Sequence, residues 1–175
     1  GQLRPGALEL EGPEAHHLLH VLRLRPGDPL VVADGRGREG VGHLLEGAGR
    51  VARVWVEQVR DGPGEPAVQV TLLQGMSQLE KLEWIVQKAT EIGVSRVLPV
   101  YTRRSQLRLG PDAAARRLER WRRIAREAAK QCGRARVPEI AAPLPLPRAL
   151  QAVAGQLLVV AWEEEADRSL AAWAR

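Results

Sequence analysis

The sequence predicts an α/β protein in which a small β-barrel precedes a parallel α/β domain, and three observations support this fold class. Residues 1–60 carry short apolar runs separated by turn residues, which is typical of strands. A cluster of helix and strand breakers, DGPGEP, follows at residues 61–66. Beyond it, apolar runs alternate with stretches of helical periodicity, the pattern of strands joined by helices in a parallel sheet.

We therefore expect two domains, a barrel over residues 1–65 and an α/β domain over residues 66–175. In the first, the apolar run PLVVA at 29–33 ends at Asp34-Gly35, a turn pair, and so predicts a strand. The valines between residues 51 and 59 alternate roughly with polar residues and predict another. The segment EGPEAHHLLHVL at 11–22 has leucines at helical spacing and predicts a short helix.

The second domain shows strand, helix, strand, helix and strand in turn. Apolar runs predict its three strands at residues 68–73, 94–100 and 157–161. The first helix is predicted to begin at a capping box, Ser77-Gln78-Leu79-Glu80, and to end at Gly93. The second is predicted to run from Pro111 to Gly133.

Ligands of parallel sheets bind beyond the carboxyl ends of the strands. That rule directs attention to three short segments, 75–77, 101–105 and 162–164.

Composition narrows the class of protein. Cys132 is the only cysteine, which excludes a disulfide framework and favours a reducing, cytoplasmic location. No apolar run reaches membrane-spanning length, so no membrane partner is expected. The chain opens on Gly1-Gln2 and its only methionine is Met76, so we expect that at least one end has been lost or is unseen.

Basic residues are concentrated in one part of the chain. The whole sequence has 26 Lys and Arg against 21 Asp and Glu, a net charge of +5. Segment 102–136 alone has 12 basic residues against three acidic ones, a net charge of +9. Such a local charge favours a polyanionic partner such as RNA or DNA. A solvated helix face is the other interpretation of this cluster.

Common catalytic and cofactor motifs do not occur. His16, His17 and His20 lack the further ligands that a metal site needs, so no metal is expected. Neither G-x-G-x-x-G nor a P-loop follows the first strand of the second domain. Two polar helix stripes indicate a site or merely an exposed face: Gln87, Lys88 and Glu91 on one helix, and Glu127, Gln131 and Arg134 on the next.

Three longer segments carry a family resemblance: HHLLHVLRLRPGD at 16–28, EKLEWIVQKATEIGVSRVLPVYTRRS at 80–105, and RWRRIAREAAKQCGRARVPEI at 120–140. Through them the chain resembles the RsmE family of bacterial 16S rRNA (uracil-N3) methyltransferases. The resemblance implies a PUA-like barrel, a SPOUT α/β domain with a deep knot, a homodimer, and S-adenosylmethionine as methyl donor. It implies 16S rRNA of the small (30S) ribosomal subunit as substrate.

The chain departs from the family pattern in three places. Gln78, Leu79 and Glu80 stand where members commonly carry a lysine followed by Gly-Asp. Arg103 replaces a commonly acidic residue. The family's G-P-E-G-G loop and L-G-x-R-I-L-R-T-E-T-A segment do not occur, so the knot portion is expected to be absent from this chain.

The resemblance and the strand-end rule together imply three sets of site residues. The catalytic set is Thr102, Arg104 and Arg134; the cofactor-binding set is Trp162 and Glu163; the RNA-binding set is Arg23, Arg25, Arg103 and Gln131. Arginine stays protonated and can stabilise negative charge on a uracil that loses its N3 proton. We expect replacement of Arg134 by Ala to reduce methyl transfer without unfolding the protein.

Two other classes of function stay open at this stage. The chain can be a non-catalytic RNA-binding module or a fragment lacking the methyl-donor pocket; failure to bind S-adenosylmethionine favours this. It can also be a dimerisation or assembly piece whose charge only keeps it in solution. Absence of salt-sensitive RNA binding favours that second class.

Overall fold

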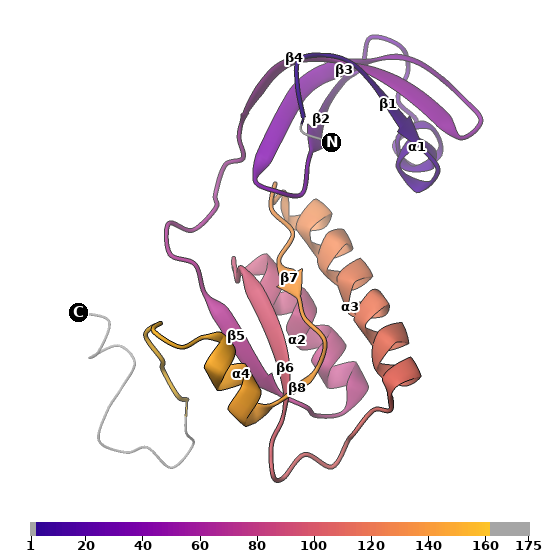
Figure 1. The fold of residues 1–175 in the computed structure, drawn as a ribbon. Helices are drawn as coiled ribbons and strands as arrows, with labels where there is room; N and C mark the ends of the chain where they lie inside the picture. Colours follow the sequence, from indigo (N-terminus) through magenta and orange to yellow (C-terminus); the bar gives the residue numbers. More distant parts are fainter. Residues whose placement is uncertain (1–2, 162–175) are drawn as a thin grey trace.

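The computed structural model describes residues 3–161 and places them in two parts, each built on its own four-stranded sheet (Figure 1). The first sheet is antiparallel with strand order β1-β4-β3-β2. The second is parallel with order β5-β6-β7, and β8 also pairs with β6. The parallel second sheet confirms the alternating strand and helix pattern of the sequence. No helix of residues 3–161 is long and apolar enough to cross a membrane.

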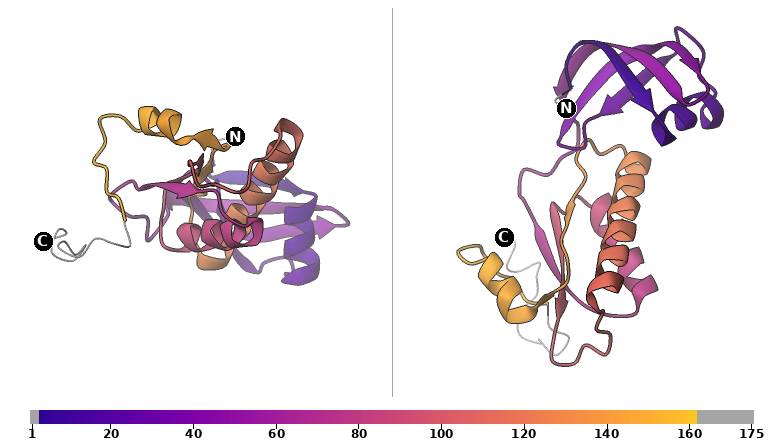
Figure 2. Two further views of the ribbon diagram at one scale, coloured as in Figure 1. Left: turned by 90° about the horizontal axis from the view of Figure 1, so that it is seen from below. Right: turned by 45° about the vertical axis from the view of Figure 1, so that its right-hand side comes forward.

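The first part is a strongly curved sheet with a short helical segment across one end (Figure 2). Its strands are β1 (Gly6–Glu11), β2 (Pro29–Ala33), β3 (Arg38–Ala48) and β4 (Val51–Asp61). Between β1 and β2 lie α1 (Pro13–His16) and a π-helical turn, η1 (His17–Val21). The sheet encloses an apolar core that includes Leu44, Val54 and Val56.

The predicted strand at 29–33 and the helix within 11–22 are confirmed. Within residues 3–161 the barrel does not close, because β1 and β2 remain at opposite edges of the sheet.

The second part is a three-layer arrangement with β6 at its centre. In chain order it comprises β5 (Thr71–Gly75), α2 (Leu79–Glu91), β6 (Arg96–Tyr101), α3 (Pro111–Cys132), β7 (Glu139–Ile140), β8 (Leu144–Pro145) and α4 (Leu146–Ala152). Helices α2 and α3 cover one face of the sheet and α4 the other (Figure 1).

Alternation along β6 builds a core on each face of the sheet. Val97 points to the α2–α3 side, where it packs in one cluster with the fully buried Trp121. Leu98 and Val100 point to the other side and pack against Ala149 of α4. This period of two places all these side chains out of water and explains why β6 reads as a continuous apolar run.

The ends of the predicted helices are partly right. Pro111 does open α3, and Gly133 ends it in the left-handed region with φ 75°, as expected. The capping box is wrong: α2 begins at Leu79, its N-cap is Gln78, and no side chain caps it. Ser77 lies one residue too early, and its hydroxyl donates to the Gln78 carbonyl oxygen instead (3.4 Å).

Two strand predictions need correction. The first strand of the parallel sheet begins at Thr71 rather than residue 68, and Val68 and Val70 are exposed. The strand predicted at 157–161 is not formed, and residues 157–160 are exposed. Instead β7 and β8 pair with β6, and both are two-residue strands too short to show a period in the sequence.

Candidate active site at the strand ends

Two loops meet where β5 and β6 end. One follows Gly75 and the other follows Tyr101, as the strand-end rule predicts. The Met76 N–H donates to the Val100 carbonyl oxygen (2.8 Å), which fixes the start of the first loop against the second strand. Between the loops lies an open hollow of about 850 Å³, lined by residues 76–81 together with Arg104, Gln106 and Leu107. We call it the strand-end hollow.

The loop after β6 is held by a tight turn at its start. The Thr102 N–H donates to the Ser105 hydroxyl oxygen (2.9 Å), and the two hydroxyl oxygens lie 3.1 Å apart. The Ser105 N–H in turn donates to the Thr102 carbonyl oxygen (3.3 Å). Arg103 and Arg104, the central residues of this turn, are exposed.

The same loop is tied again farther along. The Leu109 N–H donates to the Tyr101 hydroxyl oxygen (3.2 Å), and the Arg108 guanidinium lies 5.6 Å from the centre of the Tyr101 ring. Leu107 and Leu109 pack against the core between the sheet and α2 and α3. The loop is therefore anchored at both ends and presents its arginines to solvent.

The strand-end hollow is lined by two basic side chains, Lys81 and Arg104, and one acidic side chain, Glu80. Ser77, Gln78 and Gln106 add neutral hydrogen-bonding groups. Charged donors of this kind bind phosphate and carbonyl oxygens well. Residues 3–161 hold no group of three or more His, Cys, Asp or Glu that could bind a metal ion.

The structure brings together only part of the predicted catalytic set. Thr102 and Arg104 lie in one turn at the strand-end hollow. Arg134 lies at the opposite end of β6, because its guanidinium donates to the carbonyl oxygens of Thr90 (2.7 Å) and Val94 (3.2 Å), just before that strand begins. In the described chain Arg134 is thus separated from Thr102 by the whole length of β6.

Arg134 instead makes a buried ion pair with the segment that links the two parts. Its side chain is 6% exposed, and its Nη2 lies 2.8 Å from the Glu65 carboxylate. Nε donates to the second carboxylate oxygen (3.3 Å), which also accepts the Arg136 N–H (3.1 Å). Burial raises the pKa of Glu65, but the hydrogen bonds and charge of Arg134 outweigh it, so the pKa is lowered. These contacts lead us to expect that Arg134→Ala lowers the stability of the fold, whereas the sequence led us to expect only that it does not unfold the protein.

Residues 134–137 also dock the first part of the chain onto the second. The Gly37 N–H donates to the Ala135 carbonyl oxygen, and the Val137 N–H donates to the Gly35 carbonyl oxygen, each at 3.0 Å. A Cβ at Gly62 would lie 2.1 Å from the Cβ of Ala135, so this close approach requires glycine. Sequence reasoning missed the contact because it interpreted DGPGEP only as a linker.

The predicted RNA-binding residues divide between two places. Arg23 and Arg25 are exposed in the loop that follows η1, and Gln131 is exposed near the end of α3. Arg23 adopts φ 55°, a left-handed conformation uncommon for a residue other than glycine. Arg103 lies in the turn beside the strand-end hollow. The predicted cofactor residues Trp162 and Glu163 lie outside the described residues.

The polar stripe on α2 is explained by its own contacts. Lys88 Nζ lies 2.7 Å from the Glu91 carboxylate, and the Gln87 amide donates to that carboxylate (3.0 Å). Glu83, one turn earlier, accepts from Arg120 of α3 (2.7 Å) and pairs with Arg117. The Arg120 hydrogen bond is the main reason why the pKa of Glu83 is lowered. These residues join or cover the helices and lie away from the strand-end hollow.

Comparison with known proteins agrees with both parts of the fold. Residues 64–174 match the model of an RNA methyltransferase domain, and residues 10–51 match the model of an RNA methyltransferase PUA domain. The chain is thus a mixed α/β protein with a PUA-like domain before a methyltransferase domain.

Several proteins of known name are similar to the chain. Ribosomal RNA small subunit methyltransferase E of Bacillus subtilis is 33% identical over 132 residues, 75% of this chain and 51% of the relative. The Mycobacterium bovis protein of the same name is 33% identical over 91% of this chain and 62% of the relative. A crystal structure of the Neisseria gonorrhoeae protein of that name, bound to S-adenosyl methionine, superposes with TM-score 0.79 at 29% identity, over 89% of this chain and 64% of that one. The chain thus spans between half and two thirds of these proteins.

Proposed function

This chain belongs to the RNA methyltransferase family that includes ribosomal RNA small subunit methyltransferase E, and from that premise we propose that its protein methylates N3 of a uracil in 16S rRNA. The methyl donor is S-adenosylmethionine, which supplies an electrophilic methyl group. The observation that carries the proposal is the turn anchored by Thr102 and Ser105, which presents Arg104 at the strand-end hollow.

The chemistry of uracil defines what the protein has to do. N3 lies on the Watson–Crick edge, so the target base has to be unpaired and turned out of the stack. Loss of the N3 proton leaves negative charge on the neighbouring carbonyl oxygens. Arg104 supplies charged donors for these oxygens, and Thr102 fixes the turn that carries Arg104. Holding N3 in line with the methyl group of the donor contributes the rest of the rate enhancement.

The strand-end hollow fits the nucleotide better than the methyl donor. The donor's sulfonium is positively charged, and Lys81 and Arg104 on the wall repel such a charge. A phosphate or a uracil carbonyl is attracted by the same two side chains. We therefore assign the donor to the segment that begins at Trp162 and Glu163.

Four further assignments follow from the family. We assign residues 1–65 to an RNA-binding PUA-like domain and residues 66–175 to the front part of a SPOUT methyltransferase domain. The family's deep knot would be formed by segments that do not occur in this sequence. A homodimer acting on the 30S subunit in the cytoplasm completes the proposal.

The test is methyl transfer to small ribosomal subunits, measured with radiolabelled S-adenosylmethionine by the protein that carries this chain. We expect Arg104→Ala to lower the turnover about 10²-fold or more, as loss of a charge-stabilising donor does elsewhere. Arg148→Ala is the matched control, because Arg148 is exposed on α4, across the sheet from α3. Equal turnover of the two variants would remove Arg104 from the site. Absence of both donor binding and transfer would instead favour an RNA-binding module.

A further inference from the structure

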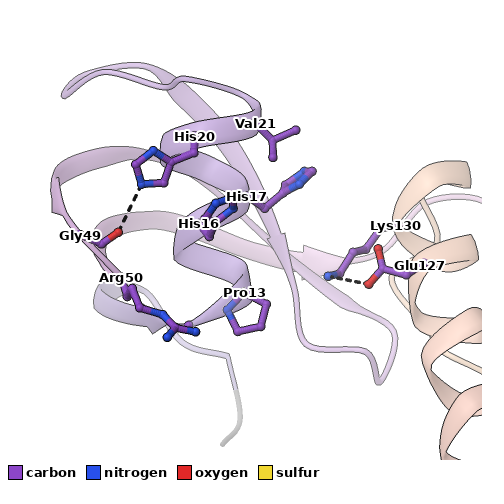
Figure 3. Close-up of a pocket in the computed structure, with 10 residues that line it drawn as sticks. Pro13, His16, His17, His20, Val21, Gly49, Arg50, Glu127 and Lys130 are labelled. Atoms are coloured by element: carbon purple, nitrogen blue, oxygen red, sulfur yellow. Dashed lines mark hydrogen bonds and ion pairs between the residues drawn. The ribbon is translucent and has the colours of Figure 1, made fainter.

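A second hollow of about 590 Å³ lies between the first part of the chain and the end of α3 (Figure 3). Three histidines and Arg50 line it from one side, and Glu127 and Lys130 line it from the other. We call it the histidine groove. Its volume falls within the range of clefts that hold small ligands or a single nucleotide, about 300–1,000 Å³.

The walls of the histidine groove are held at fixed positions. Lys130 Nζ donates to the Glu14 carboxylate (2.7 Å), which joins α3 to α1. Burial lowers the pKa of Lys130, but the hydrogen bond and charge of Glu14 outweigh it and the pKa is raised, so the lysine stays charged. The His20 ring nitrogen lies 3.4 Å from the Gly49 carbonyl oxygen on the same side of the groove.

The histidines are presented by a rare backbone conformation. Residues 17–21, which carry His17 and His20, form a π-helical turn, a rare form that is frequent at functional sites. The rings of His16 and His20 lie 4.8 Å apart and tilted by 41°, and His16, His17 and His20 are all exposed. Exposed rings of this kind are suited to stacking on an unpaired RNA base. The Arg50 guanidinium has no ion pair among the described residues and is free to bind a phosphate.

A row of basic side chains runs from the histidine groove along α3. Arg116, Arg123, Arg126 and Lys130 are exposed, and their spacings of seven, three and four residues place them on one helix face. This face is opposite the buried Trp121 and Ala125. Glu119 and Glu127 also lie on it, where Glu119 pairs with Arg122 and Glu127 with Lys130. The three arginines make no ion pair among residues 3–161, whereas Arg117, Arg120 and Arg122 are paired. We call these four residues the cation row.

Helix α3 connects the two hollows. Its 22 residues span about 33 Å. It runs from the end of the loop that follows β6 to the first part of the chain (Figure 1), and Glu127 and Lys130 near its end line the histidine groove. Within it the cation row covers about 21 Å, the length of several nucleotides. A strand lying along this row would have one end in the groove and the other directed toward the turn that carries Arg104.

We propose that the histidine groove and the cation row form a track for the RNA strand that flanks the target uridine, an inference that rests on RNA being the substrate. Arg50 and the three unpaired arginines bind backbone phosphates. The histidine rings stack on one unpaired base. The distance between the groove and the strand-end hollow then sets which nucleotide reaches the site.

The test is the salt dependence of binding to a short fluorescein-labelled single-stranded RNA, measured by fluorescence anisotropy between about 50 and 200 mM salt. For single-stranded RNA, each lost phosphate contact lowers the magnitude of the slope of log affinity against log salt concentration by about 0.7. The triple variant Arg50→Gln, Arg123→Gln and Arg126→Gln should therefore lower this slope by about 2. Lys130 stays in place, because it pairs with Glu14. Arg148→Gln, on the other face of the sheet, leaves the slope unchanged.

The histidines are tested separately. Combining His16→Ala and His20→Ala lowers RNA affinity about tenfold, as loss of a base-stacking partner does, and leaves the salt slope unchanged. Circular dichroism verifies that the variants are folded. An unchanged slope in the triple arginine variant, or an equal change per residue in Arg148→Gln, would overturn the track.

The assay also separates the track from the proposed function. Methyl transfer by the triple variant with the wild-type KM for RNA would overturn the track and leave the function standing. If the protein transfers no methyl group but the salt slope of its RNA binding still depends on these arginines, the track is supported and the proposed function is refuted.

Discussion

Replacing Arg134 by Ala tests the finding that this residue stabilises the fold. The substitution removes an ion pair with Glu65 and two hydrogen bonds to the carbonyl oxygens of Thr90 and Val94. Removing one partner of a buried ion pair costs about 3–5 kcal/mol, because the other charge stays buried alone. Glu65 is 19% exposed and keeps the Arg136 N–H, so we expect the lower end, about 3 kcal/mol.

The assay is urea unfolding followed by far-ultraviolet circular dichroism, with the free energy of unfolding extrapolated to water. Glu65→Gln is expected to cost less than Arg134→Ala, since Arg134 retains its two carbonyl partners. In a double-mutant cycle the two positions should show a coupling energy of about 1 kcal/mol or more. Arg148→Ala is the control and should change the free energy by less than about 0.5 kcal/mol. An Arg134→Ala variant as stable as that control would refute the reasoning.

Three further predictions concern the junction and the site. The pKa of Glu65 is lowered in the folded protein, so its ionised carboxylate stabilises the fold above a glutamate's ordinary pKa of about 4.3, and this stabilisation is lost as the pH falls below that value. In acid titration the free energy of unfolding of Glu65→Gln should therefore fall less than that of the wild type. Gly62→Ala should destabilise the protein by about 1–3 kcal/mol in urea unfolding, because the new methyl group overlaps Ala135. A wild-type unfolding midpoint for Gly62→Ala would contradict this close contact. Ser105→Ala removes the hydroxyl that accepts from the Thr102 N–H. Steady-state kinetics should show a lower kcat, while urea unfolding should show little change in the free energy of unfolding.

Much of the fold is readable from the sequence because local signals agree with it. The apolar run at 29–33 and its turn pair give β2 with its observed bounds. Pro111 and Gly133 mark both ends of α3, since each suits only one end of a helix. The strand-end rule likewise directs attention to the loop after β6, in which Arg104 lines an open hollow and Thr102 holds the turn that carries it.

The rest depends on contacts that no local pattern reveals. Strands β7 and β8 have two residues each and are held by pairing with β6 and by burial of Ile140. Arg134 and Glu65 are 69 residues apart in sequence, and the sequence around either residue does not predict that the two form an ion pair. The apolar run at 157–161 has strand composition, but a strand also needs a neighbouring strand to pair with, and these residues pair with none of the described strands.

The central claim is methylation at uracil N3 in small-subunit rRNA. The direct measurement is mass spectrometry of nucleosides from 30S subunits incubated with the protein that carries this chain and with S-adenosylmethionine bearing a deuterated methyl group. We expect labelled 3-methyluridine as the product, in an amount that falls with Arg104→Ala. Label in a different nucleoside, or undiminished label with Arg104→Ala, would contradict it.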